Sequence, residues 1–167
     1  MGIRTFTVAG FTTEARADAS NMTDNSYMAI KGGTSTQLTR IKEVYAAGLE
    51  ASTSSPQKLL LARDSTVGAT LTALTTGQSD EEEHPSMATV TNGPTPFTAA
   101  TTKPQRATKY LATLAFNAIG GLTRQRFPFG EEPCMLGNAA DDGEVSLSGF
   151  TGTTAGAISA HIKYETV

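Results

Sequence analysis

The clearest pattern of hydrophobic and polar positions lies in the stretch KYLATLAFNAIGGLTRQRFPF, residues 109–129. From Tyr110 to Ala118, apolar side chains recur at every second position, and the side chains between them are mostly small. Successive side chains of a β-strand point to opposite faces, so this period of two predicts a strand with one buried face. Gly120 and Gly121 can adopt positive φ and reverse the chain, which makes 122–129 the returning strand, with Arg124 and Arg126 on one face. The pattern predicts a central β-hairpin.

The same period of two predicts most of the remaining elements. The cleanest half-buried strand is 157–165, where Ile158, Ala160 and Ile162 alternate with polar residues and place His161 on the solvent face. The apolar run of Leu59 to Ala62 predicts a strand buried on both faces. Further strands are predicted at 2–12, 27–31, 56–63, 133–137 and 144–150.

Two segments need a choice between structures. Residues 37–51 contain the helix formers Glu, Ala and Leu, but their charged and apolar positions alternate and Gly48 lies inside the segment. We expect a strand there, with a helix as the alternative. Residues 64–107 are rich in Thr, Ala, Ser, Gly and Pro, and such a long polar segment in a compact domain is uncommon and often functional. We expect a long loop or arm with one short helix near 67–76, ordered by contact with a neighbouring subunit.

About eight strands with turn residues at regular spacing indicate one all-β domain over residues 1–167, a β-sandwich or jelly roll with 64–107 as an inserted loop or arm. Composition agrees, because Thr is β-branched and the chain has only 17% charged residues. A polar but weakly charged surface can be covered by neighbouring subunits without a large cost of desolvating charge.

Net charge, cysteine content and the lengths of the apolar runs limit the partners and the location that we expect. The net charge of −3 argues against nucleic acid, which needs clustered Lys and Arg. The single cysteine, Cys134, excludes an intrachain disulfide, and its setting predicts a small buried hydrophobe. The first residues, MGIRTFTVAGF, lack a signal-peptide layout, and no apolar run has the length of a membrane span. We therefore expect synthesis in a cytoplasm and no membrane partner.

Candidate chemistry is sparse. Nucleophilic catalysis needs a base close to Ser or Cys, and the two histidines, His84 and His161, are expected on the surface. We expect no enzyme activity, no cofactor and no small-molecule substrate. One acidic turn could hold a hard cation, but a bare hairpin turn is favoured and no metal is expected. The residues of this turn are Asp141, Asp142 and Glu144.

Two charged groups are candidates for interaction with other chains. The basic group could converge near the central hairpin and pair with an acidic neighbour, or could be exposed charges that protect sheet edges. Its members are Arg106, Lys109, Arg124 and Arg126. The acidic group is expected at a solvated loop tip. Its members are Asp80, Glu81, Glu82 and Glu83.

Two stretches carry a family resemblance: YLATLAFNAIGGLTRQRFP and the C-terminal GNAADDGEVSLSGFTGTTAGAISAHIKYE. Together they resemble small structural proteins of tailed-phage virions, of the jelly-roll capsid decoration or cement type. The resemblance covers about the last third of the chain. It implies a non-enzymatic virion protein, made in the host cytoplasm, that binds the major capsid protein and copies of itself as a dimer or trimer.

Two alternatives remain open from the sequence. A tail, head–tail connector or head-fibre subunit would have a ring-like rather than shell-wide distribution. A carbohydrate-binding β-sandwich module would need exposed aromatic platforms, whereas this chain has no Trp and four Tyr.

Overall fold

The computed structural model describes residues 4–11, 26–51, 56–73, 76–78, 95–102, 105–137, 143–149 and 157–167. Within these ranges the regular elements are all β-strands, so the predicted all-β class is confirmed. The strands are β1 (Arg4–Phe11), β2 (Ser26–Lys31), β3 (Thr39–Leu49), β4 (Pro56–Thr66), β5 (Ala69–Ala73), β6 (Thr76–Gln78), β7 (Thr95–Thr102), β8 (Gln105–Asn117), β9 (Ile119–Arg126), β10 (Cys134–Met135), β11 (Glu144–Gly149) and β12 (Ile158–Thr166).

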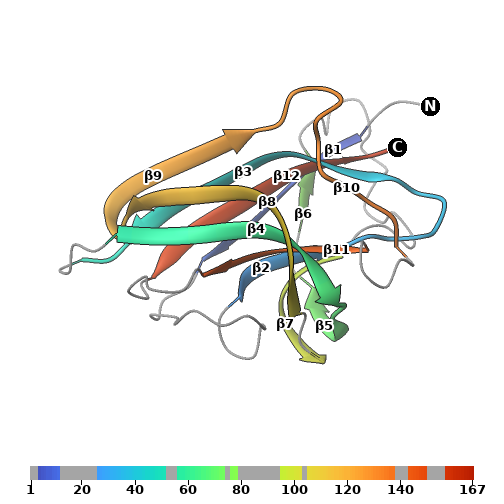
Figure 1. The fold of residues 1–167 in the computed structure, drawn as a ribbon, viewed down its shortest axis with the longest axis horizontal. Coiled ribbons are helices and arrows are strands. Elements are labelled where there is room, and N and C mark those ends of the chain that lie inside the picture. Colours follow the sequence, from blue (N-terminus) through green and yellow to red (C-terminus); the bar gives the residue numbers. More distant parts are fainter. Residues whose placement is uncertain are drawn as a thin grey trace.

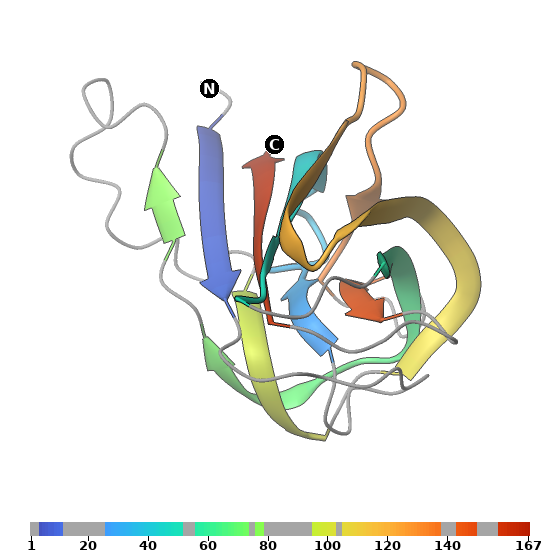
Figure 2. The same cartoon turned by 90° about the vertical axis from the view of Figure 1, so that its left-hand side faces the viewer.

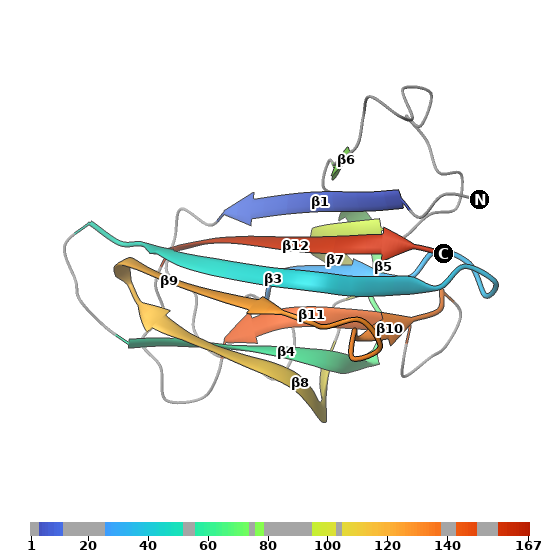
Figure 3. The same cartoon turned by 90° about the horizontal axis from the view of Figure 1, so that it is seen from above.

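The strands form two antiparallel sheets packed face to face, which confirms the predicted β-sandwich (Figure 1). Sheet A has the order β10-β3-β12-β1-β6, and β9 also pairs with β3. Sheet B has the order β5-β7-β2-β11-β4-β8. In Figure 3, β1, β12 and β3 lie side by side in the upper part of the view, and β11, β4 and β8 lie in the lower part.

Eight of these strands pair in a nested order. β1 pairs with β12, β2 with β11, β3 with β9, and β4 with β8, so the two halves of the chain run against each other like the arms of one long hairpin. When that long hairpin folds over itself, its strand pairs are divided between two layers. One layer contains β1-β12-β3-β9 and the other contains β2-β11-β4-β8. Backbone groups of the central strands are satisfied by partners on both sides.

The core lies between the two layers and follows the alternation in the sequence. On β12, Ile158, Ala160 and Ile162 are buried, whereas Ser159 and His161 on the opposite face are partly exposed, as predicted. β11, between β2 and β4 in sheet B, is buried at every position, so side chains on both of its faces are covered. Other core side chains are Val8, Met28, Ile30, Ile41, Val44, Leu59, Leu61, Leu114 and Met135.

The predicted central hairpin is wrong in its pairing. β8 pairs with β4 in sheet B, and β9 pairs with β3 in sheet A, so the turn at Ala118 carries the chain from one layer to the other (Figure 2). Leu114 and Phe116 are buried as the alternation predicts, but Tyr110 is 54% exposed. A side chain at Gly121 would collide with the backbone of Asn117, so the glycine lets the two strands pack closely at the crossing.

The expectation for residues 64–107 needs correction in its described parts, whereas 74–75, 79–94 and 103–104 lie outside the described residues. β4 extends to Thr66, β5 pairs with β7, β7 pairs with β2, and β6 pairs with β1, so the described parts of the segment widen both sheets. The helix expected near 67–76 is wrong, since the described residues form β5 and the start of β6, and Val67 and Gly68 before them belong to no regular element. Thr-rich strands can be polar here because they lie toward the sheet edges, where backbone pairing stabilises them more than core packing does. Residues 37–51 form a strand, β3, as expected.

Candidate functional site

A β-bulge in β3 places two consecutive charged residues on the outer face of sheet A. Against β12, Lys163 is opposite Glu43 while Tyr164 is opposite Ile41, so Lys42 is the additional residue. Ile41 and Val44 on either side are buried in the core. A bulge of this kind redirects side chains and bends the strand. The outer face thereby gains both a cation and a carboxylate at its centre.

Glu43 is the centre of an ion-pair cluster. Its Oε2 accepts hydrogen bonds from Arg124 Nη2 at 2.6 Å and from Arg126 Nε at 3.1 Å, and its Oε1 lies 3.5 Å from His161 Nε2. The hydrogen bond from Arg124, supported by those from Arg126 and His161, lowers the pKa of Glu43 to about 2. Glu43 is therefore a fixed anion near neutral pH and is poorly suited to donate a proton as a general acid.

A second cluster attaches the loop after β9 to β3. Lys42 Nζ lies 2.6 Å from Glu132 Oε1 and 3.5 Å from Glu165 Oε1, and Glu132 Oε2 accepts a hydrogen bond from Gly130 N at 2.6 Å. The hydrogen bond from Lys42 lowers the pKa of Glu132 to about 2 and, in turn, raises the pKa of Lys42. Arg40 lies 3.6 Å from Glu165 and 5.9 Å from the ring centre of Phe129.

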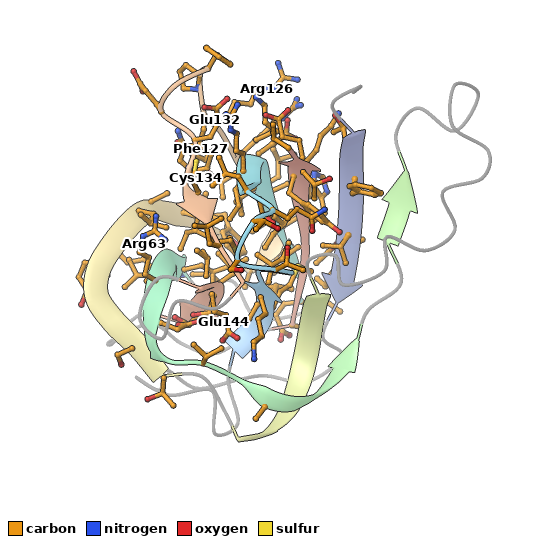
Figure 4. The ribbon with its side chains drawn as sticks, turned by 90° about the vertical axis from the view of Figure 1, so that its right-hand side faces the viewer. Arg63, Arg126, Phe127, Glu132, Cys134 and Glu144 are labelled. Carbon is orange, nitrogen blue, oxygen red and sulfur yellow. The ribbon has the colours of Figure 1, made fainter. Side chains whose placement is uncertain are left out.

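An open pocket of about 320 Å³ lies between these two clusters. Figure 4 shows Arg126, Phe127 and Glu132 together at one end of the molecule. The lining holds three cations and one carboxylate, and Phe127 supplies an aromatic wall. We call this the basic pocket; it is lined by Thr5, Lys42, Glu43, Arg126, Phe127 and Lys163.

The outer face also carries two stacked rings. Tyr45 and His161 lie opposite each other on β3 and β12, with ring centres 4.6 Å apart and planes inclined by 4°. Each ring therefore covers one face of the other. A sugar-binding platform needs an aromatic face open to the ligand, and this pair offers at most its outer faces and its edges.

A buried carboxyl pair lies in sheet B. Asp64 on β4 and Glu144 on β11 are both fully buried. Ser146 Oγ donates to Asp64 Oδ1 at 2.5 Å, Gly68 N donates to Glu144 Oε2 at 3.0 Å, and Lys31 Nζ donates to Gly68 O at 2.9 Å. Burial raises the pKa of Glu144, although the Gly68 amide, Asp64 and Lys31 oppose the shift.

The structure describes only one of the three residues of the predicted cation-binding turn, Glu144. Asp141 and Asp142 lie outside the described residues, and Glu144, at the start of β11, is fully buried rather than on an exposed turn. In the part of the chain that the structure describes, no three metal-ligating side chains form a cluster.

The structure brings two of the four predicted basic residues together. Arg124 and Arg126 meet on Glu43 of the same chain. Arg106 and Lys109 lie on β8 in the other sheet, and their side chains lie outside the described part of the structure. Alternation did indicate that Arg124 and Arg126 share a face, but no pattern in the sequence pointed to Glu43, more than eighty positions away.

Of the remaining residues singled out in the sequence, the structure describes Cys134 but not the acidic run or His84. The acidic run Asp80, Glu81, Glu82 and Glu83 lies outside the described residues, as does His84. Cys134 is only partly buried, and its Sγ donates to Glu132 O at 3.1 Å.

Exposed apolar side chains gather where β3 meets β9. Leu49 is opposite Ile119 in the register, and Leu122 is opposite Ala47 two residues away. The exposed fractions are 50% for Leu49, 43% for Ile119 and 65% for Leu122. We call these three residues the edge patch.

No helix among the described residues is long and apolar enough to cross a membrane. Comparison of the chain with protein-family models, curated proteins and solved structures finds no match. Any functional conclusion therefore depends on the site itself.

Proposed function

We propose that this protein is a non-enzymatic structural subunit of a phage virion, a capsid decoration or cement protein. It binds the major capsid protein and copies of itself, as a dimer or trimer, and stabilises the shell by bridging neighbouring subunits. Its location is the capsid.

The edge patch is the observation that carries this proposal. Contiguous exposed apolar side chains on a soluble protein mark surfaces that other molecules cover. Leu49, Ile119 and Leu122 lie on two paired strands, and β9 has β3 as its only strand partner among the described residues. A neighbour can therefore bury the apolar side chains and also hydrogen-bond the free edge of β9.

The winding of the chain supports the same class of protein. We interpret the nested pairing of β1 with β12, β2 with β11, β3 with β9 and β4 with β8 as jelly-roll winding, and jelly rolls are an architecture used by viral capsid domains. The two stretches that resemble decoration proteins contain β9 and β11 and most of β8 and β12, all of which belong to this nest.

The charged groups on sheet A favour a binding role over catalysis. Glu43 and Glu132 are both held as ionised partners of cations, whereas a glycosidase needs one carboxyl that donates a proton. The face-to-face stacking of Tyr45 and His161 makes a carbohydrate-binding role the weaker alternative.

The proposal is tested by native mass together with copy number per particle. We expect a dimer or trimer present in shell-wide copy number, and we expect Leu122→Asp to shift the protein to monomer. Thr113→Asp, which adds the same charge at an exposed position on β8, should leave the oligomer intact. A ring-like copy number would select the tail or connector alternative. A wild-type monomer that is absent from particles would overturn the proposal.

A further inference from the structure

We propose that the basic pocket binds carboxylate side chains of an acidic segment on a partner polypeptide. The inference rests on the proposed function only in taking the partner to be an assembly neighbour. The binding chemistry itself depends on the pocket.

The charge of the pocket differs in sign from that of the whole protein. The lining holds the cations Lys42, Arg126 and Lys163 and one carboxylate, Glu43, whereas the chain as a whole has a net charge of −3. Lys42 is also paired with carboxylates outside the lining, so the free positive charge comes mainly from Arg126 and Lys163. An excess of cations in a concave surface attracts anions and concentrates them there. The complementary partner is therefore anionic.

Two of the three cations have donors left for a ligand. Lys163 makes no ion pair with any carboxylate in the ranges that the structure describes, and it is only partly buried. Arg126 bonds Glu43 through Nε, and its side chain remains 70% exposed. The terminal nitrogens of a guanidinium in this position can bind a carboxylate with two parallel hydrogen bonds.

The other two charged residues of the pocket are held in place. Glu43 is bound by Arg124 as well as by Arg126, and Lys42 is bound by Glu132. The backbone N–H of Phe127 donates to Lys42 O at 2.9 Å, which holds the aromatic wall beside the bulge. The pocket is therefore largely formed before a ligand arrives, so little ordering opposes binding.

The size and composition of the pocket favour acidic side chains over nucleic acid. A volume of about 320 Å³ is near the lower end for ligand sites and suits one or two side chains. The Thr5 hydroxyl can donate to a carboxylate, and Phe127 can pack against the methylene groups that carry it. A nucleic-acid backbone needs a run of basic residues along its path, and here Glu43 interrupts the cations.

The test is fluorescence anisotropy of a labelled oligoglutamate peptide titrated with the full chain at low ionic strength. We expect Lys163→Gln and Arg126→Gln each to weaken binding about fivefold, the effect of one partly exposed ion pair. Lys58→Gln removes the same charge from an exposed position on β4 in sheet B, and it should change affinity less than about twofold.

Several results would overturn the inference: no peptide binding, an equal loss in Lys58→Gln, or tighter binding of labelled oligo-dT than of the peptide. The two proposals can fail separately. Lys163→Gln should retain the oligomeric state of the wild type, while Leu122→Asp should retain peptide binding, because the edge patch and the basic pocket share no residue.

Discussion

Replacing Glu43 by Gln tests whether the outer face of sheet A is held by a fixed ion. Gln has nearly the same shape but no charge, so the change removes the attraction to Arg124 and Arg126 while preserving packing. Glu43 is 7% exposed, so solvent cannot easily replace the lost interactions at the carboxylate itself.

The magnitude follows from the pKa. A pKa of about 2, against an ordinary 4.5, sets an upper limit of about 3 kcal/mol on the stabilisation at neutral pH. The two arginine side chains are 45% and 70% exposed, so water screens the pairs. We expect Glu43→Gln to lower the free energy of unfolding by about 1–2 kcal/mol at pH 7.

The sign of the pH dependence is fixed by the direction of the shift. Because the pKa of Glu43 is lowered on folding, its stabilisation is complete above about pH 4.5 and disappears as the pH falls toward 2. Urea unfolding of wild type and variant should therefore show a difference at pH 3 that is less than half the difference at pH 7. Glu131→Gln, at an exposed position on the nearby loop, should cost less than about 0.5 kcal/mol at either pH. A Glu43→Gln difference that is equal at the two pH values would refute the fixed-ion interpretation.

Three further changes test the sandwich itself. Because the pKa of Glu144 is raised on folding, the stabilisation from its protonated form is present below about pH 4.5 and is lost as the pH rises through the folded-state pKa. In urea unfolding, Glu144→Gln should therefore gain stability relative to wild type as the pH rises from 5 to 8. A difference between the two proteins that stays constant over this range would contradict the prediction. Gly121→Ala should cost about 2–3 kcal/mol in the same assay because the added methyl meets the backbone of Asn117, whereas Gly120→Asn, at φ +61° in open space, should cost less than about 1 kcal/mol. Leu147→Ala should cost about 3 kcal/mol in thermal or urea unfolding because the side chain is fully buried, and a loss below about 1 kcal/mol would show that the core is placed wrongly.

Much of the fold could be predicted because alternation is a local property. A period of two fixes which residues share a face, and it correctly identified β1, β3, β8, β11 and β12, while the continuous apolar run at 59–62 identified β4. It also placed His161 on the outer face of β12. Local alternation cannot say which strands pair, and the predicted hairpin failed for that reason: the turn after Asn117 joins two layers rather than two neighbours in one sheet.

The described parts of the polar segment 64–107 were predicted wrongly for a related reason. Its many Thr and Ala residues are not the large apolar side chains that mark a strand in the core, so composition indicated a loop. The existing edges of β1 and β2 supply backbone partners for β6 and β7, and that opportunity exists only after the two sheets have formed.

The candidate site depended on tertiary structure almost entirely. The sequence by itself determined an all-β chain, the core faces of its strands, and a shared face for Arg124 and Arg126. It could not place Glu43 between these arginines, because the bulge at Lys42 arises from the pairing of β3 with β12. It also could not predict the basic pocket, whose cations come from β3, β9 and β12 and meet only when those strands lie side by side. Periodicity acts between neighbours along the chain, whereas ion pairs and pockets depend on register between strands that are distant in sequence.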